Sequence, residues 1–301
     1  MRIASLLPSA TEIVCALGLA DCLVGVSHEC DYPADVVAEL PKLTRSVVPS
    51  GLASLEIDAE VSARLRRGES LYTVNEEQLA ALQPDVIITQ ELCDVCAVNF
   101  SQVQALAARM PGQPKVVSLT PPNLEGIFED VRSVAQVLGV PERGERLIAN
   151  LRARLNAIQH SVEGRPRPRV FALEWLDPPF AAGHWVPEMI ALAGGAEVLG
   201  QAGEKSFRVT WEQVAAAQPE VIILIPCGYS REQAQAEWDA LPKPALWDEL
   251  PAARMGRVYA LDANSYCSRP APRVVEGIEA LACVIHKQPT LHKEKGYASA
   301  H

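Results

Sequence analysis

Apolar positions along this chain form short runs that alternate with segments of helical period. The runs are rich in β-branched residues and show no regular polar alternation, which is typical of parallel strands covered on both faces. They cover residues 3–7, 23–26, 86–89, 116–119, 170–173, 221–225 and 258–261. Segments such as 123–138 lie between the runs and repeat their apolar residues at helical spacing, so the pattern predicts an α/β fold with parallel sheets.

One stretch of this pattern occurs twice. Residues 77–88 (EQLAALQPDVII) and 212–223 (EQVAAAQPEVII) differ at only three positions. In each copy a short amphipathic helix is expected to end at Gln-Pro, because the residue before a proline is pushed out of the α region, and an apolar strand follows. The duplication predicts two lobes of one design.

The remaining pattern predicts how these lobes are connected. The first helix is expected to start with a capping box at Ser9-Ala10-Thr11-Glu12, and an insertion over 43–75 contains a predicted helix at 55–67. From Pro141 on, apolar residues recur at helical spacing for about twenty residues, a rod of roughly 30 Å. The predicted organisation is an N-terminal α/β lobe at 1–140, a connecting backbone helix at 141–163, a C-terminal α/β lobe at 164–287 and a disordered tail at 288–301.

Composition narrows the classes of partner. The chain has 301 residues, 49% hydrophobic and 21% charged, and a net charge of −10 that argues against nucleic acid or an anionic membrane as the main partner. The sequence contains no apolar stretch long enough for membrane insertion. Met1-Arg2 leads directly into a predicted strand, so no signal peptide is expected. The sequence as it stands predicts a cytoplasmic protein, or a periplasmic one if it is a trimmed mature chain.

Several short motifs follow one another in a fixed order along residues 1–287. They are Leu7-Pro8-Ser9-Ala10-Thr11-Glu12, Ala16-Leu17-Gly18, Gly25-Val26-Ser27 with Asp31-Tyr32-Pro33, Gln83-Pro84-Asp85, Pro178-Pro179-Phe180, Ala193-Gly194-Gly195 and Pro272-Arg273. With these motifs the chain resembles the class III periplasmic binding proteins, the helical-backbone receptors for cobalamin, haem, ferric siderophores and metal ions. It is most similar to their cobalamin-binding branch.

The resemblance implies an architecture and a function. The implied fold has two doubly wound parallel-sheet lobes, one long backbone α-helix between them, and a ligand cleft between the lobes. The implied protein is not an enzyme but a solute-binding protein that holds cobalamin or a related corrinoid, or else haem or another iron chelate, for an ABC permease dimer. The sequence also lacks a G-x-S-x-G elbow, a P-loop and an H-E-x-x-H motif.

The candidate ligand-binding residues all lie in the second lobe. A flat corrin or porphyrin needs aromatic walls, and aromatic residues stand at predicted loop or strand-end positions although they make up only 5% of the chain. The candidates are Trp175, Phe180, His184, Trp185, Trp211, Asp262 and Asn264. By resemblance, Phe180 and Trp211 match ring-contacting positions. Ordinary packing is the alternative for these aromatics, and it is the expectation for Trp247.

Thiols and imidazoles indicate a rival function. Residues expected just after strands include His28, Cys30, Cys93, Cys96 and Cys267, which would hold Zn²⁺, Cu⁺ or an Fe–S cluster if they converged. For Cys93 and Cys96 the alternative is two loop thiols without a partner, and Cys15, Cys22 and Cys283 are expected to be buried and inert. The rival predictions are therefore a cytosolic soft-metal or Fe–S protein, or a cytosolic enzyme acting on the same kind of ligand.

The repeat places one glutamate at the start of each predicted helix. Glu77 and Glu212 occupy equivalent positions, and the resemblance implies that such a pair docks onto the two subunits of a permease dimer. A carboxylate in the first turn of a helix is also stabilised by the helix macrodipole, which needs no partner. Both interpretations stay open at this point.

Overall fold

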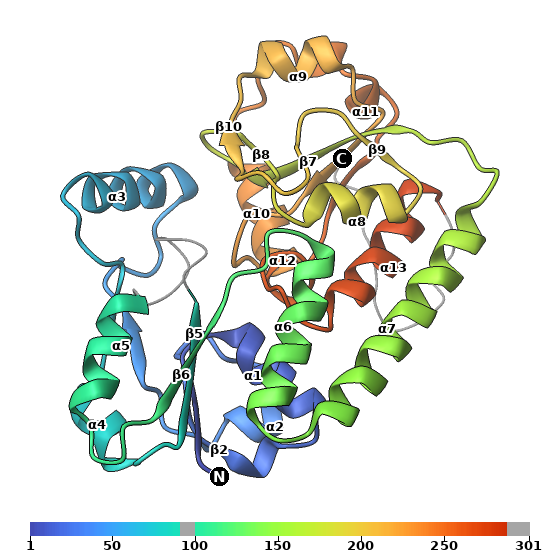
Figure 1. Ribbon diagram of the computed structural model, residues 1–301. Helices are drawn as coiled ribbons and strands as arrows, with labels where there is room; N and C mark the ends of the chain where they lie inside the picture. Colours follow the sequence, from blue (N-terminus) through green and yellow to red (C-terminus); the bar gives the residue numbers. More distant parts are fainter. Residues whose placement is uncertain (91–99, 288–301) are drawn as a thin grey trace. The chain divides into compact units, whose positions relative to one another are not determined.

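The computed structural model describes residues 1–90 and 100–287, and it divides the chain into two compact units (Figure 1). Unit 1 consists of Met1–Leu52, Glu56–Pro121 and Glu125–Ala149. Unit 2 consists of Ala53–Leu55, Pro122–Leu124 and the chain from Asn150 on. Each unit is an α/β structure around its own sheet, so the two-lobe α/β fold predicted from the repeat is confirmed.

Unit 1 is built on a four-stranded parallel sheet in the order β2-β1-β5-β6. Its strands are β1 (Ile3–Ser5), β2 (Leu23–Val26), β5 (Val86–Gln90) and β6 (Lys115–Leu119). The central strands β1 and β5 are buried at every position, because helices cover both faces of the sheet. This burial explains why their sequences are apolar runs instead of alternating patterns.

The other elements between residues 8 and 137 are helices and a small strand pair. They are α1 (Pro8–Ala16), a 3₁₀ turn at Ala20–Cys22, α2 (Ala34–Val37), β3 (Thr44–Ser46), α3 (Ser54–Arg66), β4 (Tyr72–Val74), α4 (Glu76–Ala81), α5 (Phe100–Arg109) and α6 (Leu124–Val137). Val103 and Leu106 of α5 pack with Ala4 and Ile87 on one face of the sheet, and Figure 1 shows α1 and α6 on the other face. The antiparallel strands β3 and β4 frame the predicted insertion and were not expected from the sequence.

Unit 2 contains a larger, mixed sheet in the order β10-β8-β7-β11-β12, with β9 also paired to β7. The strands are β7 (Arg169–Trp175), β8 (Phe180–Ala181), β9 (Ala196–Glu197), β10 (Phe207–Arg208), β11 (Val221–Leu224) and β12 (Val258–Ala260). Strands β7, β9, β11 and β12 are parallel, but β8 and β10 are antiparallel to their neighbours. The predicted parallel sheet is present, and the structure adds two short antiparallel strands that the sequence did not indicate, because two-residue strands are too short to show any period.

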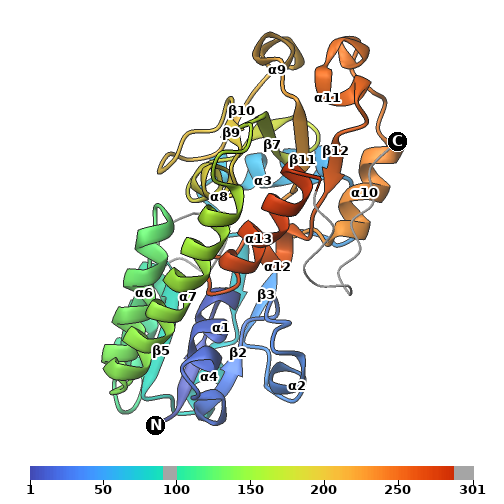
Figure 2. The ribbon, with the colours of Figure 1, turned by 90° about the vertical axis from the view of Figure 1, so that its right-hand side faces the viewer.

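The helices of unit 2 cover both faces of this sheet. They are α8 (Val186–Leu192), α9 (Trp211–Ala217), α10 (Arg231–Ala240), a 3₁₀ turn at Trp247–Glu249, α11 (Pro251–Arg254), α12 (Ala263–Tyr266) and α13 (Val274–Ile285). Helices α8 and α13 lie side by side in both views (Figures 1 and 2). Most of α13 is buried, which makes it the most enclosed helix of the unit.

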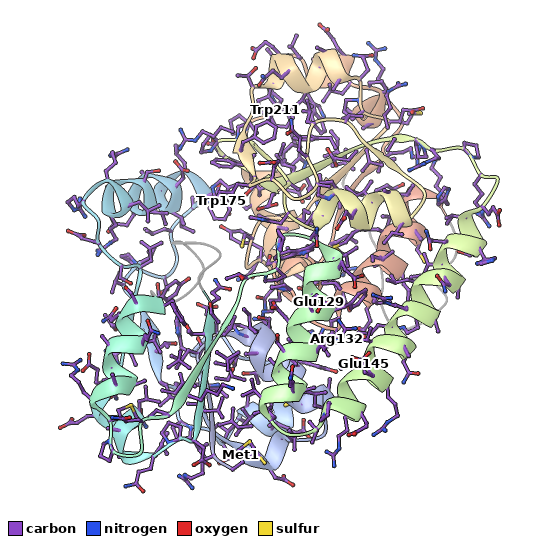
Figure 3. All side chains as sticks on the ribbon, in the orientation of Figure 1. Met1, Glu129, Arg132, Glu145, Trp175 and Trp211 are labelled. Atoms are coloured by element: carbon purple, nitrogen blue, oxygen red, sulfur yellow. The ribbon has the colours of Figure 1, made fainter. Side chains whose placement is uncertain are left out.

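The long helix predicted after Pro141 is present as α7 (Pro141–Val162), and it runs from unit 1 into unit 2. Within unit 1, Arg132 of α6 donates from Nε to Glu145 of α7 (2.6 Å) and also binds Glu129 (Figure 3). Gly144 allows this approach, because a Cβ there would lie 2.6 Å from the Cβ of Ala135. The two helices therefore touch closely along unit 1.

The duplicated stretch forms the same helix-to-strand unit twice, as α4 with β5 and α9 with β11. Both glutamines before the prolines adopt left-handed conformations, with φ of 44° at Gln83 and 50° at Gln218. A left-handed residue commonly ends a helix, so Gln83 and Gln218 end the two helices in the same way. The predicted stop at Gln-Pro is confirmed.

The repeat extends to a contact that the sequence did not reveal. Arg2, just before β1, donates from its backbone N–H to Asp85 (2.7 Å) and from Nε to the carbonyl of Leu82 (2.8 Å). Arg169, which opens β7, does the same with Glu220 (2.9 Å) and the carbonyl of Gln218 (2.8 Å). Each unit therefore uses an arginine and an acidic residue to fix the start of a central strand.

The predicted capping box at Ser9 was wrong. Helix α1 begins at Pro8, with Leu7 as the N-cap and no side-chain cap. Proline at the first helical position suits the helix start, because its missing N–H would have no intrahelical partner there. Ser9 therefore lies inside the first turn, and its buried hydroxyl has no hydrogen-bond partner among the described residues.

Among residues 1–90 and 100–287, no helix is both long and apolar enough to cross a membrane.

Candidate functional site

Unit 2 gathers polar and aromatic side chains at the carboxyl edge of its sheet, where ligands of open α/β sheets bind. Three loops leave the sheet here, after β7, β11 and β12. The backbone N–H of Cys227 donates to the carbonyl of Glu174 (3.1 Å), and that of Asn264 donates to the carbonyl of Tyr229 (3.0 Å). These bonds hold the three loops together, so their side chains share one edge.

Trp175 stands at the end of β7 and is half-buried (Figure 3). Its indole Nε1 donates to the carbonyl of Ser54 (3.1 Å), and its ring meets that of Tyr229 edge to face at 5.8 Å. Glu237 accepts the backbone N–H of Ser54 (2.7 Å) and also a hydrogen bond from the Tyr229 hydroxyl. Burial, together with this bond to Glu237, raises the pKa of the Tyr229 phenol. The orientation of the Trp175 ring is therefore fixed by hydrogen bonds as well as by packing.

Phe180 lies beside Trp175 on the neighbouring strand. In the strand register Phe180 pairs with Trp175 on one side and with Arg208 on the other. Phe180 and Arg208 are directly opposed and project from the same face, whereas the pairing of β7 with β8 is irregular between Leu173 and Trp175. We call the three register-paired residues Trp175, Phe180 and Arg208 the Trp-Phe-Arg row. The guanidinium carbon of Arg208 lies 5.6 Å from the centre of the half-buried Phe180 ring.

His184 and Trp185 follow the same turn. Trp185 is only 6% exposed and donates from Nε1 to the carbonyl of Cys267 (2.8 Å), so its ring serves packing. His184 stacks on this ring at 5.6 Å, its backbone is left-handed with φ of 51°, and its Nδ1 has no partner among the described residues. Burial and the nearby Lys205 lower the pKa of His184, so its imidazole is neutral at neutral pH.

Trp211 opens α9 and belongs to a cluster of three tryptophans. Its ring centre lies 6.1 Å from that of Trp238 and 6.2 Å from that of Trp247. Trp211 and Trp247 both pack against the hydrophobic core of unit 2. Packing was the expectation for Trp247, and for Trp211 it was the alternative to ligand contact. Contact of Trp211 with a ligand stays a prediction, and its packing role is the one that the structure describes.

The loop after β12 contains the other predicted polar residues. Asp262 accepts the N–H of Ser265 (2.9 Å) as the cap of α12, and Asn264 accepts a hydrogen bond from Arg269 (2.8 Å). Arg269 is a cation only 6% exposed, and sequence analysis missed it. Its only signal was its place beside the prolines of residues 270–272. Cys267 is also buried, and burial with the nearby Glu174 and Asp262 raises the pKa of its thiol.

The predicted metal ligands of unit 1 already have partners there. His28 lies 2.7 Å through Nδ1 from the hydroxyl of Thr44, and its ring contacts that of Tyr72 at 5.7 Å. Cys30 is 3% exposed, with its sulfur 3.1 Å from the hydroxyl of Thr11. These contacts give both the half-buried His28 and the buried Cys30 a partner within unit 1.

A metal site is not assembled in the part of the chain that the structure describes. Cys93 and Cys96 lie outside the described residues. Among residues 1–90 and 100–287, no group of three or more His, Cys, Asp or Glu side chains is placed to hold a metal ion. Cys15 and Cys22 are half-buried and only Cys283 is fully buried as expected, but burial and nearby carboxylates raise the pKa of the Cys15 thiol to about 11, which suits an inert thiol.

Glu77 and Glu212 are both exposed in the first turns of α4 and α9. The pKa of Glu212 is lowered by hydrogen bonds from the Thr210 side chain and from its own backbone N–H. The caps of the two helices are Asn75 and Thr210, so neither glutamate is needed as a cap. Their side chains are accessible to a partner.

Comparison with known sequences shows one consistent family. The sequence model described as "Periplasmic binding protein" matches residues 3–265. The vitamin B12-binding protein of Vibrio cholerae is 27% identical over 288 residues, which is 92% of this chain and 86% of that protein. The vitamin B12-binding protein of Vibrio parahaemolyticus is 26% identical over 280 residues, again 92% of this chain and 86% of that protein.

Solved structures with the same fold include two similar proteins. The apo form of the periplasmic heme-binding protein RhuT from Roseiflexus sp. RS-1 has a TM-score of 0.71 and 26% identity, covering 95% of this chain and 98% of that chain. The periplasmic vitamin B12 binding protein BtuF of Vibrio cholerae has a TM-score of 0.68 and 25% identity, covering 95% and 96%.

Proposed function

Because the chain belongs to the periplasmic binding protein family, we propose that it is a substrate-binding protein whose ligand is a corrinoid, with cobalamin as the first candidate. The relatives that are about a quarter identical over nearly the whole chain are vitamin B12-binding proteins. The role proposed is to bind the ligand and deliver it to an ABC permease, outside the cytoplasm. Binding alone is proposed, without a catalytic step.

The observation that carries this proposal is the pairing of Trp175 with Phe180 at the carboxyl edge of the unit 2 sheet. Both rings are half-buried, and hydrogen bonding to Ser54 fixes the first of them. Aromatic faces held in this way suit a large flat macrocycle, which binds through buried contact area and stacking. Asp262 and Asn264 would contribute polar contacts to the rim of the macrocycle.

Haem is the second candidate, and one residue favours it. Burial lowers the pKa of the half-buried His184 and favours its neutral imidazole, which is a form that can bind haem iron; its Nδ1 is buried, so this nitrogen is not the atom that would meet the iron. A heme-binding protein is also among the similar structures at 26% identity. A soft-metal or Fe–S protein has no comparable support in the described residues.

Titration of the purified full chain with cyanocobalamin and with haem, followed by calorimetry and absorbance, tests the proposal. We expect one-to-one binding of one of the two ligands, with a rise in melting temperature as the ligand exceeds its dissociation constant. Metal analysis of protein purified without oxygen serves as the control. Absence of binding to either macrocycle, together with stoichiometric zinc, copper or iron–sulfur content, would contradict the proposal.

A further inference from the structure

We propose that Arg208 determines ligand specificity by binding an anionic oxygen group on the edge of the macrocycle. The inference rests on the proposed function, since it assumes a macrocyclic ligand against the Trp-Phe-Arg row, and it adds the chemistry of the group that the site selects. The shared chemistry is a phosphate or carboxylate attached to a flat ring system. In cobalamin that group is the phosphodiester of the nucleotide loop, and in haem it is a propionate.

The position of Arg208 follows from three strands. Strand β8 pairs with β7 and with β10, so Trp175, Phe180 and Arg208 lie next to one another across the sheet. The guanidinium lies 5.6 Å from the centre of the Phe180 ring, while the residue as a whole is exposed. A ligand that covered the Phe180 ring would therefore meet the guanidinium at its edge.

The chemistry of arginine suits this position better than that of lysine. A guanidinium over an aromatic ring is held by cation–π attraction, and its N–H groups form a fixed fork that matches phosphate and carboxylate oxygens. Such bidentate, charge-assisted pairs are among the stronger hydrogen bonds in proteins. The whole chain carries a net charge of −10, which repels an anionic ligand, so such a ligand needs a local cation in the binding site.

The proposed anion binding requires a cation beside the Phe180 ring, and a positive charge elsewhere on the connection before β10 does not meet this requirement. Lys205 is an exposed cation just before β10. Its charge lowers the pKa of His184, and it does not pair with Phe180 in the strand register, as Arg208 does. It therefore offers a matched control, since Lys205→Gln removes the same charge from nearby without removing the guanidinium over the ring.

Two pairs of ligands, each with one anionic and one neutral member, distinguish binding of the anionic group from binding of the rest of the macrocycle. Cyanocobalamin is compared with dicyanocobinamide, which lacks the phosphodiester and the nucleotide base, and haem is compared with haem dimethyl ester, whose propionates are uncharged. Affinities are measured by calorimetry for the parent, Arg208→Gln, Arg208→Lys and Lys205→Gln. Melting curves verify that every variant is folded.

We expect Arg208→Gln to weaken binding of the anionic member of one pair by about 10-fold or more, on the scale of a lost charge-assisted bond. Binding of the neutral member should change by less than about 2-fold, Arg208→Lys should fall between, and Lys205→Gln should match the parent. The pair that responds identifies the source of the anion. If the parent binds but Arg208→Gln weakens both members equally or neither, this inference is wrong and the proposed function stands. If the parent binds none of the four ligands, the proposed function fails and the inference fails with it.

Discussion

Phe180 and Trp211 had the same sequence signal, but the fold gives them different surroundings. Phe180 is half-buried between Trp175 and Arg208 in a row across three strands. Trp211 packs with two other tryptophans against the core of unit 2. A large aromatic residue near a strand end predicts either role, and only the neighbours decide between them.

Replacing each residue by alanine distinguishes these roles. Phe180→Ala should weaken macrocycle binding by about 1–3 kcal/mol, the scale of a lost large contact, and leave the melting temperature nearly unchanged. Trp211→Ala should instead lower the free energy of unfolding by about 1–3 kcal/mol, because it removes half-buried ring contacts. Calorimetry and urea unfolding measure the two effects. If Trp211→Ala instead keeps the stability of the parent but no longer binds the macrocycle, Trp211 contacts the ligand.

Asp130 introduces a pH dependence in unit 1. Burial raises its pKa to about 7, against an opposing backbone hydrogen bond from Thr120, and its Oδ2 has no partner among the described residues. In the unfolded chain the Asp130 carboxyl has its ordinary pKa of about 4. The contribution of the neutral Asp130 carboxyl to stability is therefore fully present below about pH 4 and is lost as the pH rises through about 7. Asp130→Asn should therefore stabilise the protein by about 1–3 kcal/mol at pH 8 and have little effect at pH 4. Urea unfolding at the two pH values measures this difference, and equal effects at both would show that Asp130 is solvated.

Glu197 provides a contrasting case with a pKa also raised to about 7 by burial. Its carboxylate accepts backbone N–H groups from residues 198, 199 and 200 at one oxygen and from Ala172 at the other. An amide would replace one acceptor by a donor, so Glu197→Gln should destabilise unit 2 by about 1–3 kcal/mol at pH 8 as well. Opposite signs for these two substitutions at pH 8 are the expected result.

At the scale of elements, the repeated helix-to-strand unit fixes each sheet by the same contacts. Asp85 and Glu220 accept the backbone N–H of the arginine before or at the start of the neighbouring central strand. The side chain of Asp85 is 62% exposed, whereas that of Glu220 is 34% exposed. Water therefore competes more strongly for the first contact than for the second.

This difference in exposure predicts an order of stability effects. Asp85→Asn should cost less than about 0.5 kcal/mol, and Glu220→Gln should cost about 0.5–1.5 kcal/mol, since a partly buried hydrogen bond contributes more. Chemical unfolding of both variants under one set of conditions measures the order. Equal losses would indicate that the neighbouring arginine side chains, and not the carboxylates, hold the strands.

At the scale of the whole molecule, the two exposed glutamates of the repeat remain a prediction about a partner. Glu77 and Glu212 lie in the first turns of equivalent helices in separate units, and both are exposed. A pseudo-symmetric protein that meets a symmetric permease dimer needs one matching contact on each unit.

Charge reversal at both positions tests this partner. Glu77→Arg combined with Glu212→Arg should leave ligand affinity and melting temperature close to those of the parent, but it should block uptake through a reconstituted ABC permease. Glu76→Arg, next to Glu77 and also exposed, is the control that changes the same helix start. Normal uptake by the double variant would show that the glutamates serve only as charges in a first helical turn.

The amino-acid sequence alone predicts the long helix, the repeat and the parallel strands other than β9. The hydrophobic runs that become β2, β5, β7 and β11 are set by local period and composition, and the Gln-Pro stops depend on adjacent residues only. The motif order likewise indicated the family that the match over residues 3–265 establishes. In contrast, the start of α1 was missed by two residues, because proline at the first position competes with a capping serine.

Which side chains come into contact depends on how the whole chain folds. The hydrogen bonds of Arg2 to Asp85, of Trp175 to Ser54 and of Arg269 to Asn264, and the antiparallel strands β8 and β10, depend on chain folding that no local period encodes. The first two of these pairs are more than eighty residues apart in the sequence. Local hydrophobic patterning specifies which face of an element is buried, but the partner on that face is chosen by packing of the whole unit. For this reason the Trp-Phe-Arg row became visible only in the folded chain.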